Sequence, residues 1–209
     1  MHCCKRALDV LLRGLLLAWL FSVTAHAESV SVARAELRLN DDGYHLAAVF
    51  DINLNYAVQQ ALSRGVPLYF VGEYSLTRSR WYWLDEEIYK SEQTVKFSYN
   101  VLTRQYRISR GALYQNFDSF EDALNILMRQ TSPLIPATLI RKDSNYVSQL
   151  LKKEGNYIAA VRLRLDVTQL PRPLQVNALT SKDWDLDSGW YRWMIRPDET
   201  AAPGEAAAE

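Results

Sequence analysis

The sequence predicts a mainly β protein, built as an antiparallel β-sandwich or a strongly curved sheet with two or three short covering helices. Apolar and polar residues alternate over several runs, most regularly over Tyr157–Val167, as in strands with one buried face. Turn-forming clusters such as Asn40–Gly43 separate these runs. Strong helical spacing of apolar residues is confined to Asp118–Gln130. A sandwich of about seven to nine strands fits this pattern.

The first 27 residues have the layout of a secretory signal peptide. A basic start precedes a short apolar core, Gly14–Val23, and a small-x-small cleavage site ends at Ala27. That core is too short for a comfortable membrane span. We therefore expect cleavage between Ala27 and Glu28 and an exported, periplasmic protein; an uncleaved anchor is the alternative. A single β-rich domain, residues 28–196, and a disordered tail, residues 197–209, make up the rest.

Cleavage would change the composition of the chain. It would leave 182 of the 209 residues, which suits one domain with a sizeable core. Both cysteines, Cys3 and Cys4, would be removed, so we expect a cysteine-free mature chain without disulfides. The segment holds three of the 24 basic and one of the 24 acidic residues, so 21 and 23 remain, a formal net charge of −2. That charge gives no electrostatic case for nucleic acid, and we expect no transmembrane helix after cleavage.

The N-terminal part of the mature chain predicts a hairpin, a helix and a long strand. Ser29–Leu39 and Tyr44–Leu54 carry apolar residues on one parity and flank a turn in which Gly43 can take positive φ. Asn55–Arg64 changes to helical spacing and is followed by glycine and proline. Leu68–Trp83 is the longest strand-like run and is dense in aromatic and branched residues, so we expect a central strand there.

The middle of the chain predicts a second hairpin and a helix. Gln93–Val101 alternates cleanly, and Arg104–Arg110 follows as its partner, although the turn between them lacks the usual Gly or Asn. Asp118 is the expected N-cap of a helix that extends to Gln130. Glu121 stands three residues after that aspartate, as in a capping box.

The last third predicts short elements around the regular strand Tyr157–Val167. Prolines and glycines separate these elements. They are an edge strand within Leu134–Ile140, a helix over Ser144–Glu154, a short strand over Leu174–Leu179 and a last strand within Trp184–Ile195.

The mature chain lacks the side chains that most enzymes need. A nucleophile needs a neighbouring base, and His45 would be the one remaining histidine. A metal site needs several converging His, Cys or carboxylate ligands. We therefore expect no cofactor, no metal and no enzymatic activity. The alternative is a carboxylate-based hydrolase of envelope glycans. Its acid and base would come from Glu86 or Glu87 paired across a cleft with Asp183 or Asp185.

Arginine and tryptophan residues gather in two stretches. In Arg78–Trp83 the cations share one strand parity and the indoles the other, and three more tryptophans stand near the C-terminus. Cation–π contact and aromatic anchoring favour such groups at binding surfaces. The alternative is structural, with the indoles in the core and the arginines paired to carboxylates. The candidate binding residues are Arg78, Arg80, Trp81, Trp83, Asp183 and Trp184.

Four blocks of sequence carry a resemblance to a known family. They are Leu76–Trp83, Tyr99–Arg107, Arg162–Asp166 and Leu170–Leu179, the last followed by Asp183-Trp184. With these blocks the chain resembles, over nearly the whole mature sequence, a family of exported proteobacterial proteins classified as domain of unknown function 4390. The resemblance implies no activity, cofactor or catalytic residue. Family members are often encoded beside a membrane histidine kinase of the nitrogen-regulation type, which implies an accessory to an envelope sensor.

We therefore expect a non-enzymatic binding or accessory module for an envelope protein, with a membrane sensor kinase as one candidate partner. Such a surface requires that Trp81, Trp83 or Trp184 is partly exposed and lies close to Arg78 or Arg80. A purely structural envelope protein is a further alternative. In that case a buried arginine–aspartate pair, such as Arg104 or Arg164 with Asp166 or Asp183, would fix strand register.

Overall fold

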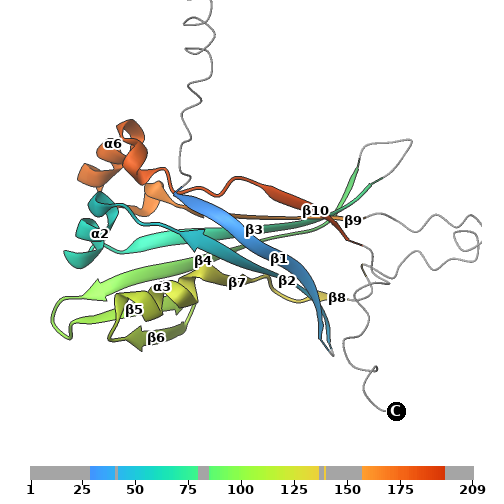
Figure 1. Ribbon diagram of the computed structural model, residues 1–209, viewed down its shortest axis with the longest axis horizontal. Coiled ribbons are helices and arrows are strands. Elements are labelled where there is room, and N and C mark those ends of the chain that lie inside the picture. The colour runs from blue at the N-terminus through green and yellow to red at the C-terminus, as the bar shows by residue number, and fades with distance from the viewer. Residues whose placement is uncertain (1–28, 41, 80–84, 137–138, 140–156, 196–209) are drawn as a thin grey trace, which may run out of the picture.

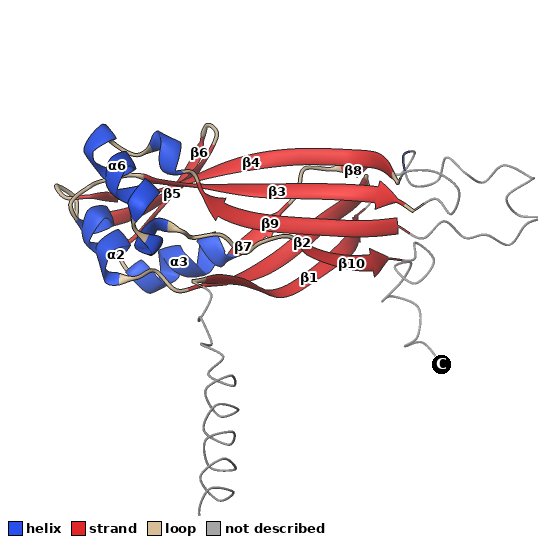
Figure 2. Ribbon diagram, turned by 90° about the horizontal axis from the view of Figure 1, so that it is seen from above, coloured by secondary structure: helices blue, strands red, loops and turns tan. Residues whose placement is uncertain are grey.

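Two antiparallel sheets stack on each other in the computed structural model, which describes residues 29–40, 42–79, 85–136, 139 and 157–195. Figure 1 and Figure 2 show the long strands side by side, with α2 and α6 gathered at one end. Ten strands and three α-helices are described. The predicted mainly β fold with short covering helices is confirmed. The expected signal peptide, the expected helix over Ser144–Glu154 and the expected tail lie outside the described residues.

The small sheet has the order β1-β2-β7, and β8 also pairs with β2. Its strands are β1 (Val30–Asn40), β2 (Gly43–Ile52), β7 (Arg129–Thr131) and β8 (Ile135–Pro136). The large sheet has the order β10-β9-β3-β4-β5-β6. Its strands are β3 (Leu68–Arg78), β4 (Glu86–Asn100), β5 (Gln105–Arg110), β6 (Leu113–Phe117), β9 (Tyr157–Leu165) and β10 (Tyr191–Ile195). The helices are α2 (Tyr56–Ser63), α3 (Phe120–Met128) and α6 (Arg172–Thr180), with 3-10 turns η1 (Val167–Gln169) and η2 (Lys182–Trp184).

The hydrophobic core lies between the two sheets because alternate residues of each strand point inward. Phe50 from the small sheet and Phe70, Val161 and Leu163 from the large sheet are fully buried there. The two predicted hairpins are confirmed as β1–β2 and β4–β5. The run that begins at Leu68 is confirmed as an interior strand, since β3 pairs with β4 on one side and β9 on the other.

The predicted helix α3 covers the inner face of the β5 end of the large sheet. Phe120 stacks on Phe97 with ring centroids 6.0 Å apart and meets Tyr106 edge-on at 5.6 Å. The predicted N-cap is wrong by one residue: the Ser119 hydroxyl accepts from the Glu121 backbone N–H. Asp118 instead accepts a hydrogen bond from Gln105 of β5, which ties the helix start to that strand.

One prediction in the second half of the chain is wrong. The expected strand over Leu174–Leu179 is helix α6, which begins just after Pro171 and carries a second proline in its first turn, a favourable helix start. The expected last strand within Trp184–Ile195 is confirmed as β10, which begins at Tyr191 because Trp184 belongs to η2. Strands β6 and β7 were not predicted.

A close contact inside β3 gives a first prediction. Gly72 has the inward parity of β3, and a Cβ there would lie 3.1 Å from the Tyr74 hydroxyl oxygen. The Tyr74 ring is fully buried and cannot move aside freely. We expect Gly72→Ala to lower the free energy of unfolding by about 1–2 kcal/mol through overpacking, measured by urea denaturation. Ser75→Ala, on the outer face of the same strand, is the control, and equal effects of the two changes would contradict the clash.

Candidate functional site

The structure places Arg78 at the far end of β3, away from the helices. Its guanidinium lies over the Tyr157 ring, 5.6 Å from the centroid, and 3.5 Å from a Glu86 carboxylate oxygen. These contacts join the ends of three neighbouring strands, β9, β3 and β4. Of the other candidates in this stretch, Arg80, Trp81 and Trp83 lie outside the described residues, so the expected Arg/Trp surface is described only at Arg78.

Trp184 lies at the opposite end of the sheet and is buried, with 5% of its surface exposed. It follows Asp183 in η2, where the Asn55 amide donates to the Asp183 carbonyl oxygen. Next to η2, Leu165 donates its backbone N–H to the Leu186 carbonyl oxygen. Leu165 pairs with Phe70, eight positions before Arg78 on β3, or about 26 Å along a strand.

Among the described candidates, Arg78 lies at one end of the sheet and Asp183 and Trp184 lie at the other, so these three residues do not form one site. Trp184 is a core residue, contrary to the expected exposure, and it lies far from Arg78. The same separation applies to the carboxylates of the hydrolase alternative. Glu86 pairs in register with Arg78, whereas Asp183 and Asp185 belong to the other end of the sheet. Those carboxylates do not face one another across a cleft.

A different arginine–tryptophan cluster is present on the outer face of the large sheet. Arg162 of β9 lies over one tryptophan, with its guanidinium carbon 6.0 Å from the Trp190 ring centroid. Arg192 of β10 lies 5.9 Å from the same ring. Arg162 also donates to both oxygens of Asp187. We call this group the Trp190 cluster; its members are Glu73, Arg162, Arg164, Asp187, Trp190 and Arg192.

The cluster is assembled by strand register. Glu73 of β3 pairs directly with Arg162 of β9, and a backbone bridge links Arg164 to Asp187. Glu73 is 8% exposed and accepts from Arg164 Nε at 2.8 Å, while a guanidinium nitrogen of Arg162 lies 3.5 Å away. The suggested register-fixing partner of Arg164 is therefore wrong: the pairing goes to Glu73 across the strands and not to Asp166. Asp166 caps η1 by accepting from Thr168.

Hydrogen bonds in and beside the cluster favour the ionised forms of its acidic and basic side chains. Hydrogen bonds from Arg162 lower the pKa of the Asp187 carboxyl, although partial burial opposes this. The same hydrogen bonds raise the pKa of Arg162. Burial favours a higher pKa for Asp166, but hydrogen bonds from Thr168 and Gln169 outweigh it and lower that pKa. The folded state thus favours both carboxylates in their ionised form.

This charge pattern predicts acid sensitivity. A carboxylate whose pKa is lower in the folded state contributes stability above its unfolded pKa, about 4, and loses it as pH falls through the folded pKa. We expect the free energy of unfolding to fall below about pH 4, and Asp187→Asn to cost about 1–2 kcal/mol at pH 7 and to reduce that fall. Urea denaturation between about pH 2 and 7 measures both effects. An unchanged acid response in Asp187→Asn, relative to the exposed control Asp185→Asn, would contradict the prediction.

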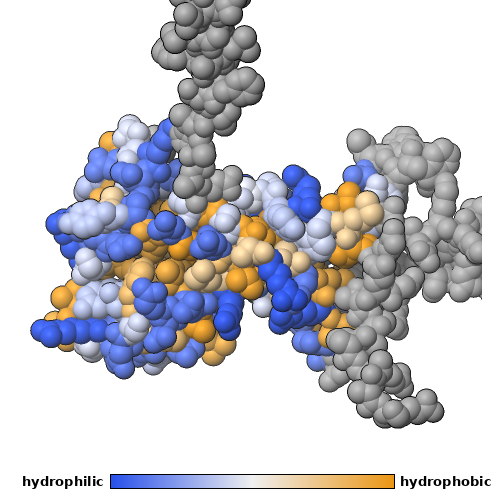
Figure 3. Space-filling view, viewed as in Figure 1, coloured by the Kyte–Doolittle hydropathy of each residue, from blue (hydrophilic) through white to orange (hydrophobic). Residues whose placement is uncertain are grey.

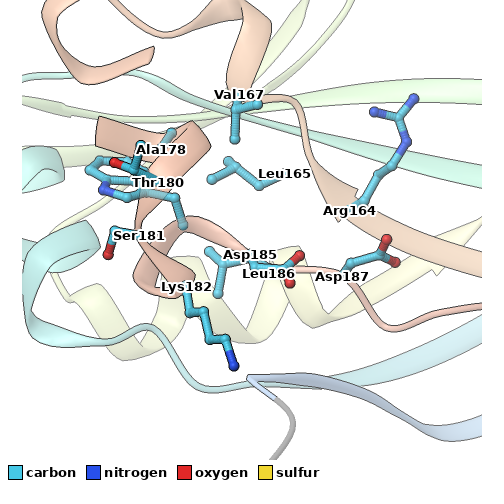
Figure 4. Close-up of a pocket in the computed structure, with 11 residues that line it drawn as sticks. Arg164, Leu165, Val167, Ala178, Thr180, Ser181, Lys182, Asp185, Leu186 and Asp187 are labelled. Carbon is cyan, nitrogen blue, oxygen red and sulfur yellow. The ribbon is translucent and has the colours of Figure 1, made fainter. Parts of the chain in front are cut away.

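A pocket of about 350 Å³ adjoins the cluster (Figure 4). It lies between the C-terminal end of α6, η2 and the end of β9, and its apolar lining includes Leu165, Val167 and Leu186. In the close-up, Arg164 and Asp187 lie near each other at one end of the pocket. Both also belong to the Trp190 cluster, so the pocket is a continuation of the same surface.

Strand β10 brings apolar and aromatic side chains to the edge of this surface. Tyr191 is 44% exposed and Met194 60% exposed, while Trp193 is half-buried and packs against the core. Among the strands the structure describes, β10 pairs only with β9. The apolar residues along the middle of the face drawn in Figure 3 lie over the region of β1 and β2, apart from β10. The edge therefore combines a backbone that can pair with another strand and exposed apolar and aromatic side chains that can contact it.

The sequence contained two signals for this cluster that the prediction did not use. Arg162 and Arg164 alternate with the buried residues of β9, which places them together on the outer face. Arg192 stands between Trp190 and Trp193, the same mixture of cations and indoles that singled out Arg78–Trp83. No sequence signal marks Glu73 as their partner, because that contact depends on the β3–β9 register.

The structure bears on the expected lack of a metal site, a transmembrane helix and cysteines only within the residues that it describes. Within the described ranges, no three His, Cys, Asp or Glu side chains gather where they could hold a metal ion. None of the helices described there is long and apolar enough to cross a membrane. The chain as a whole is not cysteine-free, since it contains Cys3 and Cys4, and both lie outside the described residues.

Comparison with known proteins places the chain in a family. No curated protein matches the chain, and no solved structure does. The model of one protein family, described as Domain of unknown function (DUF4390), matches residues 27–194, well over half of the sequence. This match confirms the family resemblance that the four sequence blocks carry. The protein therefore belongs to the DUF4390 family.

Proposed function

We propose that the protein is an exported, periplasmic, non-enzymatic binding module for an envelope protein. In this proposal the edge strand β10 and the neighbouring Trp190 cluster receive an extended, acidic segment of the partner. The observation that carries the proposal is the combination, on one edge, of a strand flank that no described strand covers and an arginine–tryptophan group. Strand addition supplies affinity through the main chain, and side chains beside the edge supply specificity.

Charge supports an acidic partner segment. Within the cluster, Arg162 forms ion pairs with Asp187 and Glu73, and Arg164 forms an ion pair with Glu73. Arg192 is exposed and makes no ion pair with any described residue, while its guanidinium is held over Trp190. A guanidinium that is positioned by an indole and lacks a carboxylate is suited to bidentate binding of a partner carboxylate.

The side chains of β10 support a protein partner in preference to a small solute. Tyrosine, tryptophan, methionine and arginine are the residues enriched in protein–protein interfaces, and all four occur between Trp190 and Met194. A membrane sensor kinase, which the family resemblance suggests, is one protein of the required class.

In-cell photocrosslinking tests the binding proposal. A photoreactive residue at Met194 should capture an envelope protein, and Arg192→Glu should weaken the capture because two like charges then meet. The matched controls are a photoreactive residue at Thr94, exposed on β4, and Arg34→Glu on β1 of the other sheet. No capture at Met194, equal capture at Thr94, or capture that survives Arg192→Glu would contradict the proposal.

Export has a separate test. N-terminal sequencing of the protein recovered from the periplasmic fraction should begin at Glu28, because the small-x-small site ends at Ala27. A recovered chain that still contains Lys5 would contradict cleavage, and recovery only from the cytoplasmic fraction would contradict export.

A further inference from the structure

Among the strands that the structure describes, β6 forms the other edge of the large sheet, and it lacks the features that usually protect an edge. Its sequence, Leu113–Phe117, contains no charged residue and no proline. Leu113 is 79% exposed and Tyr114 65% exposed. Natural sheets normally block such edges with charges, prolines or bulges, because an open edge pairs readily with another strand.

Strand β1, at an edge of the small sheet, has those features. It carries Arg34, Glu36 and Arg38, and its register shifts between Val32 and Arg34. The two edges therefore differ within one molecule: β1 is protected against pairing, and β6 is open to it. An open edge with two large exposed apolar side chains indicates a surface that another strand covers.

The backbone of β6 determines which residues can pair. β5 and β6 are joined by a two-residue turn in which Gly111 has φ 56°, and Arg110 and Leu113 form the closing pair. In such a hairpin the two residues of the closing pair exchange backbone hydrogen bonds, and so do the two residues of every second pair after it. Leu113, Gln115 and Phe117 therefore direct their backbone groups toward β5, while Tyr114 and Asn116 direct theirs to the open edge.

We infer that β6 is the contact strand of a homodimer, in which two copies pair their β6 strands antiparallel about a two-fold axis at Gln115. This register places Tyr114 opposite Asn116 of the second copy, so the two residues with outward backbone groups bond to each other. It also places Leu113 opposite Phe117, so apolar side chains meet. No like charges face one another, which makes the strand complementary to itself.

The side chains of the contact strand are already held in place. The Arg107 guanidinium lies 4.7 Å from the Tyr114 ring centroid, and Arg107 Nε donates to Asn116 Oδ1 at 2.8 Å. Both side chains thus lie on the outer face with Arg107 between them. Prior ordering of this kind lowers the entropy cost of association. The contact strand is short, so we expect a weak dimer whose population depends on protein concentration.

Analytical ultracentrifugation of the exported chain tests the dimer. The sedimentation coefficient should rise with concentration, and Gln115→Lys should abolish the rise because two ammonium groups then face each other across the axis. Thr94→Lys adds the same charge at an exposed position of β4 and should leave the dimer intact. A monomer at every concentration, or a dimer that survives Gln115→Lys, would overturn the inference.

Disulfide trapping tests the dimer independently, because it detects a covalent link that forms between two β6 strands and not the loss of a contact in a variant. On the two-fold axis, residue 115 of each copy is about 4.5–5.5 Å from its equivalent, within the range a disulfide spans. Gln115→Cys should therefore form a covalent dimer under mild oxidation, and Thr94→Cys should not. Equal crosslinking of the two variants would show random collision and would overturn the proposed register.

Discussion

Replacing Trp184 by alanine is expected to lower the free energy of unfolding by about 3–5 kcal/mol, the usual cost of removing a buried indole. Its side chain is 5% exposed and belongs to the main core. It also lines the pocket beside α6 and η2, so its removal enlarges an existing cavity in addition to the lost burial. Urea denaturation followed by circular dichroism measures the change.

Trp193 provides the matched control, because it has the same side chain but lies half-buried on the edge strand β10. We expect Trp193→Ala to cost roughly half as much, since less apolar surface leaves the interior. If Trp193→Ala proves more destabilising than Trp184→Ala, Trp184 is not the core residue that its burial indicates. The comparison also separates stability from binding: under the proposed function, Trp193→Ala should alter partner capture at Met194 while the fold remains intact.

Local patterns predicted the elements whose environment is regular. The alternation over Tyr157–Val167 identified β9, since all five residues of one parity in that strand are buried. The helical spacing after Asp118 identified α3, since one stripe of it meets the sheet. In both cases a single face is buried over the full length, and such burial imposes a period that is visible in the sequence.

The predictions from sequence failed where an element is only partly buried, or where a residue is buried by elements distant in the sequence. Helix α6 has no fully buried residue among those whose side chains are described, so its apolar residues did not show a helical stripe. β6 has four exposed residues and a half-buried one, and therefore no alternation. Trp184 was assigned to a binding surface by its neighbours in sequence, whereas η2, which packs against α2 and α6, places it in the core. These contacts depend on tertiary packing.

The Trp190 cluster could be predicted only in part for a related reason. Its arginines were visible as the polar parity of β9, but their carboxylate partners come from β3 and from the segment before β10. Strand order and register decide which of the chain's acidic residues meets Arg162 and Arg164. Because the sequence alone does not give strand order and register, it indicates the arginines of the cluster but not the carboxylates that pair with them.

Glu73 is the residue on which this cluster depends, and Glu73→Gln is expected to cost about 2–3 kcal/mol of unfolding free energy. The buried carboxylate neutralises two guanidiniums, and its loss leaves Arg162 and Arg164 with Asp187 as their remaining carboxylate. The cost stays below that of a fully buried pair because the arginine side chains are 28% and 34% exposed, and water screens them.

Glu92→Gln is the matched control, because Glu92 stands directly opposite Glu73 on β4 but is exposed. We expect it to change the unfolding free energy by less than about 0.5 kcal/mol. The double variant Glu73→Gln with Arg164→Gln should cost less than the sum of the two single changes, since each single change breaks the same pair. Additive effects would show that the pair is not coupled. Coupling with unchanged partner capture at Met194 would assign Glu73 to the scaffold, leaving Arg192 as the cation that the proposed partner meets.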